Sequence, residues 1–111
     1  MTTLDLLTRF KAHHGGITDY RTAKMLGISH QTVSAWKGGG TMSDETGVKV
    51  AESIGLDPVK VLIDLHLERD KGNATFQVWK AMAKRLEVAA VPVVVGLVGY
   101  GAGALWINPL I

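Results

Sequence analysis

The chain has 111 residues, of which 47% are apolar, and its formal net charge is +2. This length suits one small domain with a short addition, and the apolar content argues against a disordered chain. The sequence contains no cysteine, which excludes a disulfide framework and a zinc site built on thiolates, and which fits a reducing cytoplasm.

The first stretch of the chain predicts a helix that is capped by Thr2 or Thr3 and ends near Ala12. Its inward stripe is expected to consist of Leu4, Leu7 and Phe10, or of Leu6 and Phe10. The adjacent His13 and His14 would point to different sides of any regular element and would therefore make a poor metal pair. We expect both histidines to be solvated loop residues.

Two short helical patterns meet at Gly27 within residues 18–37, TDYRTAKMLGISHQTVSAWK. Ala23 lies four residues before this glycine and Val33 lies six residues after it, which is the spacing of a helix-turn-helix. A residue as small as Ala23 lets two helices cross closely. Gly27 stands where the first helix ends, a position that usually requires the left-handed conformation. The segment therefore predicts two helices joined by a tight turn.

The second helix of this motif is expected to be capped by Ser29 and to cover residues 30–37. Its buried side would hold Val33 and Trp36, and Ile28 and Val33 would pack against Met25 and Leu26 of the preceding helix. The outward side would hold His30, Gln31, Thr32, Ser34 and Lys37. These are short donors and acceptors with one cation, the types that contact base edges and phosphates. A plain helical hairpin with a solvated face is the alternative, and the combined offsets favour DNA binding over it.

A fourth helix is predicted to begin at Ser43 and to stop at Gly55. Gly47 inside this helix weakens it by ~1 kcal/mol relative to alanine, so a closely packed neighbour is expected there. Asp57 followed by Pro58 predicts the start of a fifth helix. The apolar side of that helix is expected to consist of Val61, Leu62, Leu65 and Leu67.

Most of the net positive charge lies in the segment that contains the motif. Residues 6–43 carry five basic side chains and one acid, a net charge of +4, whereas residues 44–87 carry seven basic and eight acidic side chains. A local basic excess is typical of a surface that contacts phosphates. We add Arg21 and Lys24, on the first helix of the motif, to the candidate DNA contacts. Because the excess is modest, useful affinity would require a dimer.

A resemblance to a known family extends past the motif, through SAWKGGG and the following MSDETGVKVAESIGLDP. From about Leu4 to Leu65 the chain resembles the Cro/repressor-type (XRE) helix-turn-helix proteins, many of which are phage repressors. The resemblance implies an all-α fold, a compact bundle of five to six helices in which residues 1–72 form the DNA-binding domain. It also implies binding to double-stranded DNA as a homodimer on paired half-sites, with no cofactor and no catalysis.

Two positions depart from the pattern of that family. The family often has glutamine at the first residue of the second helix, where it supports phosphate contact, and Asp19 stands there in this chain. A carboxylate that faced a phosphate would be repelled, so we interpret Asp19 as an acid that stabilises the helix dipole. Lys37 stands where the family often has an acid, and it adds positive charge beside the predicted DNA face.

Residues 73–87 predict one additional amphipathic helix, capped by Asn73 and ending near Leu86. Its apolar residues include Phe76, Trp79 and Met82. Two interpretations stay open for this helix. Either it completes the core, with Trp79 filling a gap, or its apolar residues form part of a homodimer interface.

Residues 88–111 form a hydrophobic tail of 24 residues without a charged side chain. As a helix, about 20 such residues suffice to cross a bilayer. Lys84 and Arg85 precede the tail, so the positive-inside tendency would keep the rest of the chain at the cytoplasmic face of the bacterial inner membrane. The alternative is a β-branched, glycine-rich tail that packs on a partner subunit or on the domain itself, or that is only loosely ordered. We favour the membrane, since so small a domain has little other use for this much uncharged surface.

Two functional hypotheses follow for a protein expected in the cytoplasm. The first is a sequence-specific transcriptional regulator, of the phage or prophage repressor kind, that binds operator DNA as a dimer. The second is a membrane-associated interaction module that uses a repressor-like fold to bind another protein. An enzyme is disfavoured, because the four histidines and the scattered carboxylates offer no nucleophile–base pair and no metal-ligand spacing.

Overall fold

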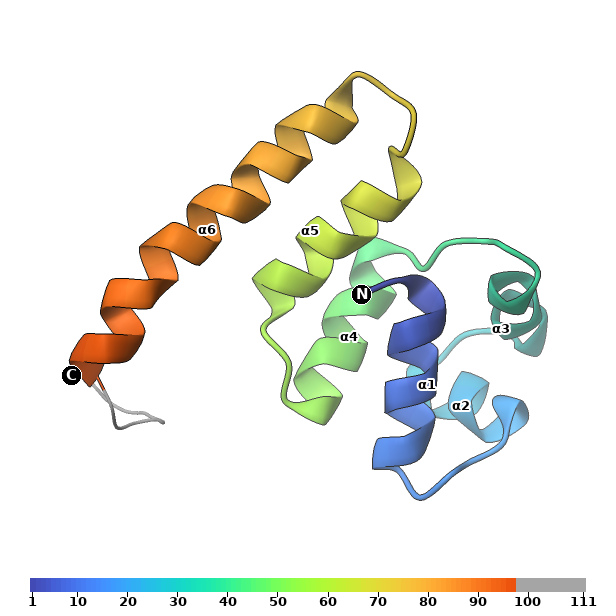
Figure 1. The fold of residues 1–111 in the computed structure, drawn as a ribbon. Helices are drawn as coiled ribbons and strands as arrows, with labels where there is room; N and C mark the ends of the chain where they lie inside the picture. Colours follow the sequence, from blue (N-terminus) through green and yellow to red (C-terminus); the bar gives the residue numbers. More distant parts are fainter. Residues whose placement is uncertain (98–111) are drawn as a thin grey trace. The chain divides into compact units, whose positions relative to one another are not determined.

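The computed structural model describes the backbone of residues 1–97 and the side chains of residues 1–87. All regular structure in this range is helical, which confirms the all-α prediction (Figure 1). The helices are α1 (Thr3–His13), α2 (Asp19–Leu26), α3 (His30–Lys37), α4 (Asp44–Ile54), α5 (Pro58–Arg69) and α6 (Thr75–Leu97). The chain divides into a first unit, Met1–Trp79, and a second unit that begins at Lys80. The first unit contains the predicted motif.

The first five helices begin where the sequence placed a capping oxygen. Thr2 and Asp5 form a reciprocal capping box at the start of α1, in which each side chain accepts a hydrogen bond from the other residue's backbone N–H. The other four caps are Thr18, Ser29, Ser43 and Asp57. Each of these side chains accepts a hydrogen bond from the backbone N–H of a residue two or three positions later. Local side-chain chemistry therefore determines where these helices begin.

One hydrophobic core joins α1 to α5. Its buried residues are Leu6, Leu7, Phe10, Ala23, Leu26, Val33, Trp36, Met42, Val50, Ala51, Val61 and Leu65. Leu4 was wrongly included in one version of the α1 stripe, since its side chain is 46% exposed. The buried face of α1 is centred between Leu6, Leu7 and Phe10, and Leu4 lies roughly a third of a turn from that centre.

Helices α4 and α5 pack side by side around Gly47 (Figure 1). A Cβ atom built on Gly47 would lie 2.4 Å from Leu65 Cδ1 and 3.6 Å from Val61 Cγ1. The closely packed neighbour expected at this glycine is therefore α5. Any larger residue would push the two helices apart, so α4 and α5 can pack this closely only with glycine at position 47.

The last helix differs from its prediction at both ends. It begins at Thr75, after a turn in which the Phe76 N–H donates to the Asn73 carbonyl at 3.1 Å, so Asn73 does not occupy the cap itself. It also continues to Leu97, past the predicted end at Leu86. That end had been placed where charged residues give way to apolar ones, and such a change of composition does not by itself stop a helix.

Trp79 of α6 lies against α5. Its ring stacks on the His66 ring, with centroids 4.1 Å apart and an angle of 22° between the planes. This contact favours the interpretation in which Trp79 completes the packing of the first unit. Val78 and Met82 remain exposed on the same helix.

No helix within residues 1–97 is both long enough and apolar enough to cross a membrane. The predicted spanning segment covers residues 88–111, and its part from residue 98 onward lies outside the described residues.

Candidate nucleic-acid interface

The turn between α2 and α3 has the geometry that the motif requires. Gly27 is left-handed, with φ of +70°, and its N–H donates to the Lys24 carbonyl at 3.2 Å. The Ile28 N–H donates to the Ala23 carbonyl at 3.0 Å. These bonds close the C-terminus of α2, and the buried Ala23 sits at the helix contact. The sharp turn therefore fixes the direction in which α3 leaves.

One side of α3 anchors it to the core. Val33 and Trp36 are buried, and Ile28 is partly buried against the same cluster. The Ser29 Oγ accepts the Thr32 N–H at 3.2 Å and thereby caps the helix. Met25 was expected to pack with these residues, but its side chain is 43% exposed, because it points from α2 toward a different surface.

The other side of α3 is exposed and polar. The five predicted contact residues on it are all exposed, namely His30, Gln31, Thr32, Ser34 and Lys37. The Thr32 Oγ1 lies 2.9 Å from the Ser29 Oγ, so this hydroxyl has a local partner as well. Arg21 and Lys24 are exposed on α2, with the Lys24 Nζ 5.6 Å from the centre of the Tyr20 ring. The structure thus gathers short polar side chains on one helix, and their contact with DNA stays a prediction.

A cluster of three charges lies at the N-terminus of α2. The Lys11 Nζ of α1 donates to Asp19 Oδ1 at 2.6 Å, and the Lys37 Nζ of α3 donates to Asp19 Oδ2 at 2.7 Å. The hydrogen bond from Lys11, followed by that from Lys37, lowers the pKa of Asp19 to about 2. We call these residues the Asp19 bridge. It joins α1, α2 and α3 through one carboxylate.

The Asp19 bridge extends what the sequence predicted for its members. Asp19 is the first residue of α2, as expected for an acid that stabilises the helix dipole. Its two lysine partners were not predicted, since they lie eight and 18 residues away in sequence and on other helices. Lys37 was expected to add positive charge beside the predicted DNA face. Its side chain is 53% exposed, but its ammonium group is already paired.

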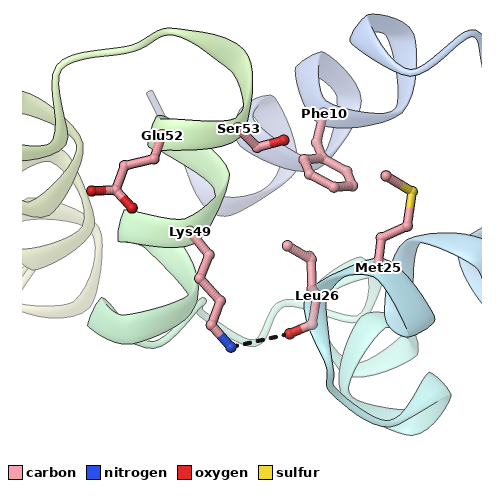
Figure 2. A pocket seen from close by; sticks show the side chains of 6 residues that line it. All are labelled: Phe10, Met25, Leu26, Lys49, Glu52 and Ser53. Carbon is pink, nitrogen blue, oxygen red and sulfur yellow. Dashed lines mark hydrogen bonds between the residues drawn. The ribbon is translucent and has the colours of Figure 1, made fainter.

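A surface pocket of about 360 Å³ lies between α1, α2 and α4. It is lined by Phe10, Met25, Leu26, Lys49, Glu52 and Ser53 (Figure 2). The Lys49 Nζ extends toward the Leu26 carbonyl and donates to it at 3.4 Å (Figure 2). Leu26 is the last residue of α2, so this cation stabilises the negative end of that helix. No local sequence pattern predicts this contact, because Lys49 lies on another helix, α4.

The end of α1 lies close to this pocket. His14 Nε2 is 3.0 Å from Ser53 Oγ, and the His14 ring lies 4.5 Å from the Phe10 ring. His14 follows α1 and is partly exposed, with Ser53 of α4 as a partner, whereas His13, which was expected in a loop, is instead the exposed last residue of α1. Within the described residues, no three His, Cys, Asp or Glu side chains are grouped so that they could hold a metal ion.

Comparisons with known proteins give no family for this chain. No family model matches it, no curated protein is similar to it, and no solved structure matches it. The geometry that bears on function is therefore the chain's own, above all the exposed polar side of α3.

Proposed function

We propose that this protein is a sequence-specific DNA-binding regulator of transcription, of the phage or prophage repressor kind, and that α3 is its recognition helix. The observation that carries the proposal is the division of α3 into two sides. Val33 and Trp36 anchor it, while the opposite side offers short donors and acceptors to solvent. A helix of this composition fits the major groove, where base edges present matching donors and acceptors.

Charge supports the same proposal. The basic excess of residues 6–43 is +4 even with Asp19 counted. Positive charge on this segment favours approach to phosphates whatever the base sequence. Because the excess is modest, we propose that the protein acts as a homodimer on two half-sites about one DNA turn apart.

The experiment begins with selection of a binding site from a random duplex library by the full chain. Gel-shift titrations then compare this site with a scrambled duplex at several salt concentrations. Gln31→Ala and Thr32→Ala should each weaken binding to the selected site by about 5- to 150-fold, as expected for a lost base contact of ~1–3 kcal/mol. Gln77→Ala and Thr41→Ala are matched controls, because both positions are exposed and lie outside α2 and α3.

The outcomes separate the two functional hypotheses. Enrichment of one sequence, with binding that weakens as salt rises, supports the regulator. If no sequence is enriched, or if both α3 variants bind as the parent does, the recognition helix is wrongly assigned. The interaction module, with a repressor-like fold that binds a protein, would then be the better hypothesis.

The uncharged tail carries a separate proposal, membrane tethering through residues 88–111. Cells that express the full chain are fractionated beside cells that express a version ending at Glu87. The full chain should sediment with membranes and the shortened chain should not. Equal solubility of the two chains would refute tethering.

A further inference from the structure

We propose that Asp19 determines specificity by competing with DNA phosphates for Lys11 and Lys37, so that it suppresses binding to DNA of arbitrary sequence. This inference rests on the proposed DNA-binding function. It assigns a role to the one acid within the basic segment 6–43.

The geometry of the Asp19 bridge resembles that of a lysine-bound phosphate. Each carboxylate oxygen accepts from a different lysine, Oδ1 from Lys11 at 2.6 Å and Oδ2 from Lys37 at 2.7 Å. These are short, charge-assisted hydrogen bonds. The carboxylate is 19% exposed and lies between the two lysines. Each ammonium group gives one of its three N–H donors to this carboxylate, so a phosphate that approaches either lysine competes with an anion that is already bound.

The position of Asp19 adds to this competition. It is the first residue of α2, where the helix carries partial positive charge and unpaired N–H groups that favour an anion. The Asp19 carboxylate thus interacts with three sources of positive charge, namely the two ammonium groups and the N-terminus of α2. The bridge lies beside the recognition surface, because Lys37 is the last residue of α3.

Competition of this kind acts unequally on two classes of DNA. Binding to arbitrary sequence depends almost entirely on phosphate contacts. Base contacts from α3 hold the selected complex in one register, so its phosphates stay where those contacts place them, whereas a complex on arbitrary DNA can settle wherever both lysines reach phosphates. Removing the carboxylate should therefore strengthen arbitrary binding more than selected binding, and the ratio between the two affinities should fall.

The test measures the affinity of the full chain for the selected duplex and for a scrambled duplex of equal length, over a range of salt. For Asp19→Asn, the slope of log Kobs against log salt on the scrambled duplex should steepen by about 0.9 for each lysine that gains a phosphate. Affinity for that duplex should rise roughly tenfold per lysine at low salt. The selected duplex should gain less.

Three controls make the result specific to the bridge. Glu52→Gln changes the net charge equally, but at an exposed acid on α4, so it should leave the ratio of affinities unchanged. Adding Lys37→Gln to Asp19→Asn should reduce the steeper slope by about 0.9. Circular dichroism of each variant checks that the helices persist.

The failure of this inference differs from the failure of the proposed function. If the parent chain prefers its selected site but Asp19→Asn leaves the scrambled-duplex slope and affinity unchanged, the inference is overturned and the function stands. An equal gain from Glu52→Gln also overturns it, since general charge would then explain the effect. If no sequence is preferred by the parent chain, the proposed function itself is refuted.

Discussion

The pairs α2–α3 and α4–α5 contain the same turn, although they differ in what they expose. Each first helix ends at a left-handed glycine, Gly27 with φ of +70° and Gly55 with φ of +77°. In each turn the residue after the glycine donates its N–H to the carbonyl five residues earlier. The Ile28 N–H donates to the Ala23 carbonyl at 3.0 Å, and the Leu56 N–H donates to the Ala51 carbonyl at 2.8 Å. A capping residue then starts the second helix, as Ser29 and Asp57 do.

The second helices of the two pairs have different environments. On α3 only Val33 and Trp36 are buried, and the remaining positions are exposed. On α5 only Val59 and Lys60 are exposed, and every residue from Val61 onward is buried or partly buried. The local turn therefore occurs twice in one chain and does not identify a DNA-binding element. The exposed polar side of α3 is what distinguishes the two pairs.

The acidic residues at the first positions of α2 and α4 also differ in their partners. Asp19 and Asp44 are each the first residue of a helix, after a hydroxyl cap. Asp44 accepts hydrogen bonds from Arg69 and from His66, the latter at 3.0 Å, so it joins α4 to α5. The Arg69 guanidinium, with a smaller effect from His66, holds the pKa of Asp44 below its ordinary value. Asp19 instead accepts hydrogen bonds from Lys11 of α1 and from Lys37 of α3, the proposed recognition helix.

Truncation of a buried side chain in α3 or α5 should have the largest effect on stability. It tests whether both helices depend on the shared core. Trp36→Ala on α3 should lower the free energy of unfolding by ~3–5 kcal/mol, and Leu65→Ala on α5 by ~2–5 kcal/mol, because each leaves a cavity at a buried position. Urea denaturation followed by circular dichroism measures both. Val59→Ala, at an exposed position of α5, should change stability by less than ~0.5 kcal/mol. Parent-like stability of Trp36→Ala would mean that α3 is not anchored as described.

The features that were predictable from sequence are those set by neighbours in the chain. The bounds and inward side of α3 follow from the helical period and from the cap at Ser29. The packing partner of Gly47 could be expected because a glycine inside a helix costs stability unless something fills its place. Caps, periods and glycines act over a few residues, and so they can be recognised without knowing the fold.

The features that sequence reasoning missed depend on tertiary structure. The lysines of the Asp19 bridge are on two other helices, and no local pattern brings them together. The stacking of Trp79 on His66 likewise depends on where α6 begins in space. The end of α6 was misplaced because only composition changes near Leu86, with no glycine or capping signal there.

A smaller effect tests the equivalence of the two turns. Gly27→Ala and Gly55→Ala should each lower the free energy of unfolding by about 1–2 kcal/mol, because a Cβ is disfavoured in the left-handed conformation. Neither new Cβ would meet an atom closer than 4.0 Å, so backbone strain is the expected cause in both. Thermal unfolding of the two variants measures the change. Gly38→Ala, where φ is −93°, is the control that avoids this strain. Clearly unequal losses would contradict the equivalence.

Neutralising Asp19 or Asp44 should have the smallest effect on stability, and the salt dependence of DNA binding should distinguish the two variants. Asp19→Asn and Asp44→Asn should each lower the free energy of unfolding by about 1 kcal/mol or less, since their cationic partners are partly solvated. Only Asp19→Asn should also change the salt dependence of binding to scrambled DNA, because Asp44 pairs with α5 and not with α3, the proposed recognition helix. A change of slope in Asp44→Asn would remove the contrast between the two acids.

The pH dependence of this effect has a definite sign. A carboxyl whose pKa is lowered by folding stabilises the native state above its unfolded value, 3.8, and loses that contribution as pH falls through its folded value, about 2 for Asp19. The stability difference between the parent and Asp19→Asn should therefore be constant above about pH 5 and should shrink between pH 4 and pH 2. Urea titrations across this range measure it, with Glu45→Gln as a control at an exposed acid. A difference that stays constant down to pH 2 would show that the bridge does not form in solution.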